Sequence, residues 1–542
     1  MSQELADLAL INGAVWTGDP LAPRTDAVAV RSGRITALGS DAVADLIGPD
    51  TRVVDCGGGS VVPGFQDAHC HPPQAGNALL RVWLNDDLGL DAYLARIKKY
   101  ADEHPDEPFI VGGGWAMECF PGGTPRKEDL DAIVPDRPVF LFNKDVHGAW
   151  VNSKALEIGG IGRDTPDPAD GRIERDAATG EPTGTLHEGA AYSFNDRYVP
   201  LPTLEDWQAA ILAAQRHLHA LGITGWQDAW ITPATLAAYH ALADSGRLTA
   251  RVVGALWWDR HSGLEQIDGF VEQRERGRAG SFFPTSVKIM TDGVLENYTG
   301  ALLEPYFDGH GGATDNRGLT YVDPAVLRDA VTLLDARGFQ VHMHAIGDRA
   351  VRNCLDAVAA ARQANGMNDL RHHIAHIQVI QPEDVPRFAE LGVVANCQPY
   401  WAQHEPQMDE LTTPYLGEQR FAMQYLFGDL ERHGTAIAMG SDWPVTTANP
   451  LREIEVAVRR IGPDHRANPP LLPSQGLSLD SALRAFTSGS AFVNHDPDAG
   501  VLRVGARADI ATIDHDLFEE GVLPADARVT MTVAAGRVVY EA

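Results

Sequence analysis

The sequence predicts an α/β protein, a (β/α)8 TIM barrel with a small β-sandwich domain built from both termini and an insertion after the first barrel strand. Three observations support this prediction. From about residue 204 onward, apolar strand-like runs alternate with amphipathic helix-like stretches. Both ends of the chain contain short β-rich segments, and about residues 75–203 do not fit the repeat. The expected division is therefore 1–62 and 491–542 for the small domain and 63–490 for the barrel with its insert.

The elements follow in order along the chain. Short strands separated by Gly and Asp turns are expected near residues 6–12, 27–32, 34–39 and 52–55, and again near 509–514 and 529–540. Amphipathic patterns predict helices at 324–337, 349–365 and 382–391. Eight barrel strands are expected at 61–72, 222–228, 251–257, 285–292, 339–345, 372–378, 393–398 and 435–442.

Composition limits the class of protein. At 542 residues the chain is too long for one compact core. Its net charge of −30, without a Lys/Arg run, argues against nucleic acid or an anionic membrane as a partner. No apolar stretch reaches the roughly 18 residues of a membrane span. Five scattered cysteines without CxxC pairs are typical of reduced thiols, so we expect a cytoplasmic protein with a small-molecule substrate. A homodimer is one state that the sequence allows.

Potential metal ligands fall at the ends of several predicted barrel strands. His69 and His71 are two residues apart, so their side chains share one face of the first strand. Active sites of (β/α)8 barrels form where the strands end, which brings residues from different strands to one mouth. Together the candidates have the composition of a metal site. The predicted ligands are His69, His71, Lys288, His344, His376 and Asp442.

Lys288 allows two interpretations. It lies in an apolar strand interior, where an unpaired ammonium group is costly. It could pair with a carboxylate such as Asp292. Alternatively, burial and neighbouring positive charge lower its pKa, and the neutral amine reacts with carbon dioxide to form a carbamate that bridges two cations.

Further residues are candidates for contact with the substrate. His147, from the insert, could act as a catalytic residue at the substrate carbonyl or only pack the insert. Trp115 and other aromatic residues of the insert would cover the pocket and favour an apolar substituent. Gln398 and Trp443 lie beside strand ends, where substrate contact and simple packing are both open. His342 shares the face of His344 but lies deeper in the barrel, which favours a core position, or support of a ligand from behind, over direct metal binding.

Several motifs, in this order, resemble those of the amidohydrolase superfamily, in particular the family 3 branch that includes N-substituted formamide deformylases. The resemblance spans nearly the whole chain. The motifs are VPGFQDAHCH at 62–71, DVHGAWVNSKAL at 145–156, VKIMTDG at 287–293, HAIGDRA at 344–350, RHHIAH at 371–376, GSDWP at 440–444 and GARADIA at 505–511.

The resemblance implies a ligand set and a cofactor. His69, His71 and Asp442 would hold one divalent metal, expected to be zinc. A carboxylated Lys288 would bridge to a second metal held by His344 and His376, and the choice between one metal and two stays open. The branch usually has Glu before the strand-six histidine, where this chain has Ala375.

We therefore expect a metal-dependent hydrolase that cleaves a non-peptide carbon–nitrogen bond, such as that of an N-substituted formamide. Metal-bound hydroxide would attack the carbonyl, and Asp442 would act as general base and then general acid. Deamination, or hydrolysis of a cyclic amide or ester, is the alternative on the same site. A non-catalytic scaffold is disfavoured because every expected ligand position is filled.

Overall fold

The computed structural model describes residues 5–542, and its centre is a parallel eight-stranded sheet that closes into a barrel. Each strand except the first and last pairs with two parallel neighbours, in sequence order. The predicted (β/α)8 fold is confirmed. The barrel strands are β8 (Phe65–Cys70), β15 (Ile223–Ile231), β16 (Arg251–Trp257), β17 (Phe282–Met290), β18 (Gln340–Ala345), β19 (His373–His376), β20 (Val394–Cys397) and β21 (Ile437–Met439).

Hydrogen bonds from the last strands close the barrel onto β8. The Asn396 side chain donates to the Ala68 carbonyl at 2.8 Å, and the Asp442 backbone N–H donates to the His69 carbonyl at 2.7 Å. The barrel strands are buried along most of their length, as expected for a parallel sheet with helices outside and a filled core inside. The residues that follow β21 are thereby held directly against the end of β8.

The barrel helices begin where the sequence provides a cap. Thr203 starts α7 with a reciprocal capping box to Asp206, and Asp323 caps α10 ahead of Pro324. These helices cover the outside of the barrel and bury the apolar outer faces of its strands. Those discussed are α7 (Leu204–Ala220), α8 (Pro233–Asp244), α9 (Gln266–Gly277), α10 (Pro324–Ala336), α11 (Asp348–Asn365), α12 (Val385–Leu391), α14 (Phe427–Arg432), α15 (Pro450–Arg459), α16 (Leu479–Arg484) and α17 (Ser490–Val493).

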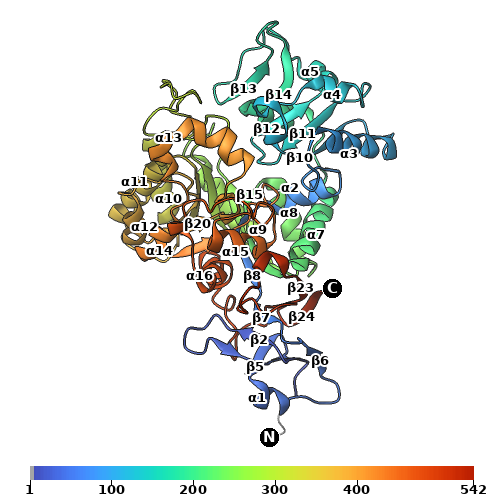
Figure 1. Cartoon of the computed structure of the whole chain (residues 1–542), viewed down its shortest axis with the longest axis vertical. Coiled ribbons are helices and arrows are strands. Elements are labelled where there is room, and N and C mark those ends of the chain that lie inside the picture. The colour runs from blue at the N-terminus through green and yellow to red at the C-terminus, as the bar shows by residue number, and fades with distance from the viewer. Residues whose placement is uncertain (1–4) are drawn as a thin grey trace.

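Both ends of the chain build the small β domain, which lies at one end of the molecule (Figure 1). A four-stranded sheet has the order β5-β4-β1-β6, and a six-stranded sheet has the order β24-β23-β22-β7-β2-β3. The strands are β1 (Leu8–Ile11), β2 (Ala14–Trp16), β3 (Arg24–Thr25), β4 (Val28–Arg31), β5 (Arg34–Leu38), β6 (Arg52–Asp55), β7 (Ser60–Pro63), β22 (Ile510–Ile513), β23 (Val529–Ala534) and β24 (Arg537–Glu541).

The single strand expected over 61–72 is two strands in the structure. Residues of β7 pair with β2 and β22 in the small domain, whereas β8 pairs with β15 in the barrel. The break falls at Gly64, where a Cβ atom would lie 2.5 Å from the Thr224 hydroxyl. Periodicity alone did not reveal this change of sheet, because the apolar run continues through it.

The insert forms its own sheet at the opposite end of the barrel from the small domain (Figure 1). Its strand order is β13-β14-β12-β11-β10-β9. Short helices pack on this sheet and give the insert its own apolar core. The elements are α2 (Pro72–Leu79), β9 (Val82–Trp83), α3 (Leu90–Glu103), β10 (Ile110–Trp115), α4 (Lys127–Asp131), β11 (Val139–Asn143), β12 (Gly148–Val151), α5 (Ser153–Gly159), β13 (Gly171–Arg175), β14 (Pro182–Glu188) and α6 (Gly189–Tyr198).

Candidate metal centre and active site

A cavity of about 200 Å³ lies where the barrel strands end and the insert covers them. All seven charged or metal-ligating residues that the sequence predicts for this site lie in its wall. They are His69, His71, His147, Lys288, His344, His376 and Asp442. The cavity therefore joins residues from five barrel strands or their ends with one from the insert.

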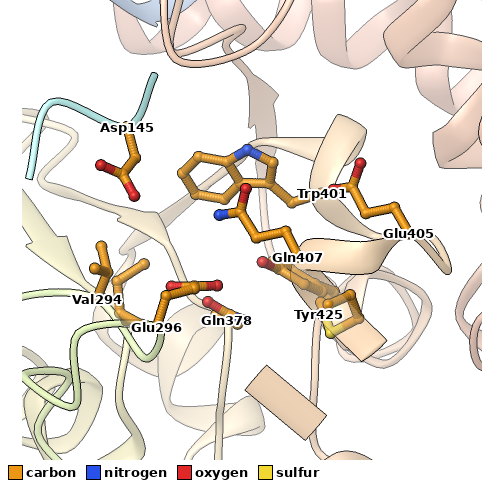
Figure 2. Close-up of a pocket in the computed structure, with 10 residues that line it drawn as sticks. Asp145, Val294, Glu296, Gln378, Trp401, Glu405, Gln407 and Tyr425 are labelled. Atoms are coloured by element: carbon orange, nitrogen blue, oxygen red, sulfur yellow. The ribbon is translucent and has the colours of Figure 1, made fainter. Parts of the chain in front are cut away.

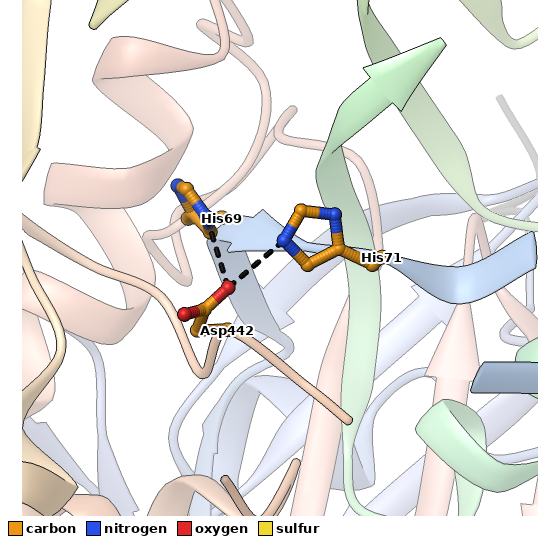
Figure 3. A group of neighbouring side chains, drawn as sticks. All are labelled: His69, His71 and Asp442. Atoms are coloured by element: carbon orange, nitrogen blue, oxygen red, sulfur yellow. Dashed lines mark hydrogen bonds and ion pairs between the residues drawn. The ribbon is translucent and has the colours of Figure 1, made fainter. Parts of the chain in front are cut away.

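His69, His71 and Asp442 form the tightest group of possible ligands in the cavity. Their ligand atoms all lie within 4.8 Å of one another. The Asp442 Oδ1 atom lies 3.0 Å from His69 Nε2 and 2.9 Å from His71 Nε2, and Figure 3 shows both rings directed at this one oxygen. The i and i+2 spacing at the end of β8 thus places both imidazoles on the same carboxylate.

Buried hydrogen bonds hold the two halves of this group together. Asp67 accepts the backbone N–H groups of His69 at 2.9 Å and Ser441 at 3.1 Å, and it accepts the Ser441 hydroxyl at 2.6 Å. Gly440 allows the close approach, because a Cβ atom there would lie 2.4 Å from the His69 backbone nitrogen. The segment after β21 is therefore held against β8 by contacts within the protein.

The chemistry of these residues fits a divalent cation. His69 Nε2 and His376 Nδ1 are buried nitrogens without a hydrogen-bond partner, and both face the Asp442 carboxylate, at 3.0 and 3.9 Å. Buried polar atoms normally have a hydrogen-bond partner, so two buried nitrogens without one beside the same carboxylate indicate a site for a cation. Imidazole and carboxylate ligands suit zinc and related metals.

His344, His376 and Lys288 line the same cavity outside the tight group. The rings of His344 and His376 lie 4.5 Å apart between centroids. His344 Nε2 lies 3.3 Å from the Gly293 carbonyl, so this nitrogen has a protein partner. Asp292, the alternative partner for Lys288, instead accepts three backbone N–H groups between 2.8 and 3.0 Å. A second metal at these residues stays a prediction.

Lys288 and Asp442 differ in how their surroundings affect their charge. Burial lowers the pKa of Lys288 to about 7, although the Asp442 carboxylate opposes the shift. Burial alone would raise the pKa of Asp442, but the hydrogen bond from His71 and the charges nearby bring it below its ordinary value. At neutral pH the cavity therefore holds an ionised carboxylate and an amine that is partly neutral.

His147 lines the cavity and forms a buried ion pair with Glu188, also of the insert. Its Nδ1 atom lies 2.9 Å from Glu188 Oε2, and Glu188 Oε1 accepts the Thr299 hydroxyl at 2.8 Å. Burial would lower the pKa of His147, but the Glu188 charge and hydrogen bond raise it to about 9. His147 is thus a cation at neutral pH, with Glu188 fixing its orientation.

Four residues around the cavity adopt left-handed backbone conformations. The φ angles are 63° at Val146, 53° at Glu188, 76° at His376 and 55° at Asp442. Such angles are uncommon for residues with a Cβ atom, and they concentrate at functional sites because the surrounding structure maintains them.

Three residues that the sequence analysis offered for substrate contact do not line the cavity. Trp115 packs in the insert core against Phe120 and Trp150, and its indole N–H donates to the Leu141 carbonyl. Trp443 is buried and stacks on the His217 ring. Gln398 accepts the His376 backbone N–H at 2.7 Å, so it holds a possible ligand. Trp115, Phe120 and Trp150 are instead buried in the apolar core of the insert.

The aromatic wall of the cavity instead comes from the barrel. The Trp230 and Trp257 rings lie 5.0 Å apart between centroids with their planes tilted by 30°, and Trp258 and Tyr192 also line the cavity. Trp230 and Trp257 lie at the ends of β15 and β16, a position that could have marked them in the sequence. Glu188 was also missed, because nothing in the sequence links it to His147.

A smaller cavity adjoins the first, and Asp145, Val294 and Trp401 line both. Figure 2 shows the Asp145 and Glu296 carboxylates and the Trp401 ring around it. Trp401 also stacks on His376, with ring centroids 5.4 Å apart. The Trp401 side chain therefore separates the metal-ligand candidates from this second space.

Comparison with known proteins is consistent with this site. Residues 52–540 match the model of the amidohydrolase family. The chain is 31% identical over 99% of its length to protein LONG AFTER FAR-RED 3 of Arabidopsis thaliana, and covers 92% of it. It is 28% identical over 95% of its length to N-substituted formamide deformylase of Arthrobacter pascens, and covers 94% of it. An uncharacterized metal-dependent hydrolase from Pyrococcus horikoshii OT3 superimposes with a TM-score of 0.74 at 25% identity, covering 96% of this chain and 99% of that one.

The chain combines a parallel eight-stranded barrel with histidine and carboxylate side chains clustered at its strand ends, and it is an enzyme of the metal-dependent hydrolase class. The family match extends over the barrel, the insert and the part of the small domain that begins at residue 52. The chain belongs to the amidohydrolase family. Among residues 5–542, no helix is long and apolar enough to cross a membrane.

Proposed function

We propose that this enzyme hydrolyses the carbon–nitrogen bond of a small non-peptide amide whose nitrogen carries an apolar substituent, as in an N-substituted formamide. One observation carries the proposal. A single cavity contains the His69, His71 and Asp442 group, the cationic His147 and the aromatic wall of Trp230 and Trp257. Such a cavity can activate water, stabilise a carbonyl oxygen and bind an apolar group.

His69, His71 and Asp442 would hold one divalent cation, for which zinc is the best match to the donor set. When bound, a cation of this kind lowers the pKa of water and polarises a carbonyl group. If a second cation binds, His344 and His376 would hold it. Lys288 would join the two after its neutral amine adds to carbon dioxide and loses a proton to give the carbamate.

Asp442 is the proposed general base and acid. His69 Nε2 and His71 Nε2 both lie against its Oδ1 atom, which leaves the second oxygen, Oδ2, for the attacking water. The ionised carboxylate would accept a proton from the attacking water and deliver it to the amide nitrogen as the carbon–nitrogen bond breaks. Because the pKa of Asp442 is below its ordinary value, the carboxylate is ionised at neutral pH and can accept that proton.

His147 is the proposed partner of the carbonyl oxygen. Glu188 holds the Nδ1 side of the ring, which leaves Nε2 as the nitrogen available to the cavity. A charged N–H group directed at an oxygen that gains negative charge stabilises the transition state more than the ground state. The insert would therefore take part in catalysis as well as covering the barrel.

The similarity to N-substituted formamide deformylase of Arthrobacter pascens supports the choice of substrate, because it extends over 95% of this chain. The wall of Trp230, Trp257 and Trp258 supports an apolar or aromatic substituent on the nitrogen. We also propose a cytoplasmic location, since all five cysteines are free thiols and three of them are buried.

The test is an assay of zinc-loaded protein against N-substituted formamides, N-acyl amino acids, cyclic amides and aminopurines. Release of formate in step with amine from N-benzyl or N-alkyl formamides is the expected result. Release of ammonia without formate would show a deaminase instead. Turnover of only the cyclic amides would contradict the formamide assignment, and no turnover of any substrate would contradict the amide hydrolase itself.

A further inference from the structure

A continuous chain of buried hydrogen bonds runs from His69 through the barrel to the end opposite the cavity. His69 Nδ1 lies 2.7 Å from His342 Nε2, and His342 Nδ1 lies 2.6 Å from Gln227 Oε1. His373 Nε2 reaches the same Gln227 oxygen at 3.0 Å. Gln227 Nε2 lies 3.0 Å from Gln340 Oε1. All five side chains are at most 2% exposed, so they are shielded from bulk solvent.

The direction of these hydrogen bonds is set at the far end. Gln340 Nε2 faces two backbone carbonyls, that of Arg371 at 2.9 Å and that of Val493 at 2.7 Å. A carbonyl oxygen can only accept, so the amide nitrogen of Gln340 must point there and its oxygen must point to Gln227. The Gln227 amide therefore donates through Nε2, and its Oε1 is an acceptor.

The orientation of Gln227 determines which ring nitrogens carry hydrogen in the two histidines beside it, His342 and His373. Gln227 Oε1 accepts from both His342 Nδ1 and His373 Nε2, so each of these nitrogens carries a hydrogen. His373 Nδ1 lies 3.1 Å from Asn396 Nδ2, a donor, and is consequently the unprotonated nitrogen of that ring. A full charge on His342 would be buried without a carboxylate in contact, which is strongly unfavourable. His342 is therefore neutral, and its Nε2 carries a lone pair.

The hydrogen bond between His342 and His69 carries this orientation to the cavity. Since His342 Nε2 accepts, His69 must donate through Nδ1, and the lone pair of the His69 ring is on Nε2. That Nε2 atom faces Asp442 Oδ1 at 3.0 Å and has no hydrogen-bond partner. Two acceptors at this distance repel each other unless a cation binds to both. The ring tautomer and the carboxylate together thus specify a cation-binding pair.

We propose that His342, Gln227 and Gln340 are positioning residues for the metal centre: they fix the tautomer of His69 so that Nε2 is always available as a ligand. His71 differs, since its Nδ1 atom has no hydrogen-bond partner and its tautomer is not fixed in this way. Outer partners of metal-bound histidines are usually carboxylates or backbone carbonyls. Here a second imidazole, oriented through two amides by the backbone at the far end of the barrel, takes that role.

This inference rests on the proposed metal centre, so its test measures metal affinity separately from activity. The zinc affinity of apo protein is determined by competition with a chromophoric chelator for wild type, His342→Leu, His342→Gln and Gln227→Leu. Loss of an outer partner typically weakens metal binding about 10- to 100-fold. We expect that loss for both leucine variants, although Gln227 lies one residue further from the ligand than His342. A glutamine at 342 can accept from His69 and donate to Gln227, so it should retain most of the affinity.

The matched control is His219→Leu. His219 is a buried histidine on α7 that bonds the Ile223 carbonyl and the Thr249 hydroxyl, both at 2.8 Å, outside the chain of bonds. Its variant should lose stability in thermal unfolding while keeping wild-type zinc affinity. Leucine variants that fold and bind zinc as tightly as wild type would overturn the positioning role alone. Failure of wild type to bind zinc would overturn the metal centre, and with it this inference.

Discussion

His147 Nδ1 lies 2.9 Å from Glu188 Oε2, and neither residue belongs to the barrel. Glu188 ends β14 of the insert, and its other oxygen accepts the hydroxyl of Thr299, which lies in the barrel loop between β17 and α10. The ion pair therefore connects insert and barrel at the cavity wall. It makes the position of His147 depend on how the insert is seated.

Replacing Asp442 with Asn should leave a folded protein with little turnover. Asparagine keeps the size of the side chain but cannot accept the proton from water. We expect kcat to fall about 10²- to 10⁴-fold, the usual contribution of a general base. Steady-state kinetics with circular dichroism as the control for folding would measure this. Turnover at the wild-type rate would exclude the proposed role of Asp442.

The Glu188→Gln variant tests the charge of His147 through its pH profile. The pKa of His147 is raised to about 9, so the cationic form that binds the carbonyl oxygen is present below that pH and is lost as the pH rises through it. Without the Glu188 charge, burial lowers this pKa. The alkaline limb of kcat/KM, measured between about pH 6 and pH 10, should therefore move to lower pH. An unchanged limb would show that His147 does not act as a cation.

Trp257→Ala should weaken selection for apolar substituents. Removing the indole takes apolar surface from the cavity wall, and we expect kcat/KM for an N-benzyl substrate to fall about 10- to 100-fold relative to an N-methyl one. Trp115→Phe is the matched control, since Trp115 lies in the insert core. That variant should lower the melting temperature without changing the ratio of the two substrates. If only Trp115→Phe changed the ratio of kcat/KM between the two substrates, Trp115 of the insert and not Trp257 would contact the substituent.

Gly440→Ala should destabilise the protein and disturb its metal centre. The new methyl group would lie 2.4 Å from the His69 backbone nitrogen, so the segment that carries Asp442 must shift. Overpacking of this kind costs about 1–3 kcal/mol in the free energy of unfolding. Gly269→Ala, an exposed helix position with no atom within 4 Å, should instead be neutral or stabilising by up to about 1 kcal/mol. Urea unfolding of both variants compares them, and equal stabilities would contradict the close packing.

The sequence was sufficient to predict the barrel and the gathering of the candidate ligands at one cavity, because both depend on local pattern. Apolar runs between amphipathic stretches located the strands, and the rule that strand ends share one mouth predicted that His69, His344, His376 and Asp442 lie together. The same logic extends to Trp230, the penultimate residue of β15, and to Trp257, the last residue of β16. They were overlooked because tryptophan has no ligand chemistry to draw attention to it.

Other features could not be predicted because they depend on contacts between distant segments. Composition suggested that Trp115 lined the pocket, but a separate insert sheet needs its own core and buries that side chain. Glu188 meets His147 only through the pairing of β12 with β14, a register that no periodicity reveals. The hydrogen bonds between Gln340 and His69 likewise require strands from different parts of the chain to be adjacent.

The seam between β8 and the residues after β21 has a consequence for how the protein acquires its metal during synthesis. His69 and His71 leave the ribosome early, but their shared partner Asp442 follows some 370 residues later. The strand before them, β7, needs β22 from near the end of the chain to complete its sheet. A nascent chain therefore cannot bring His69, His71 and Asp442 together early, and with these residues as the proposed ligands, metal loading would follow translation of nearly the whole polypeptide.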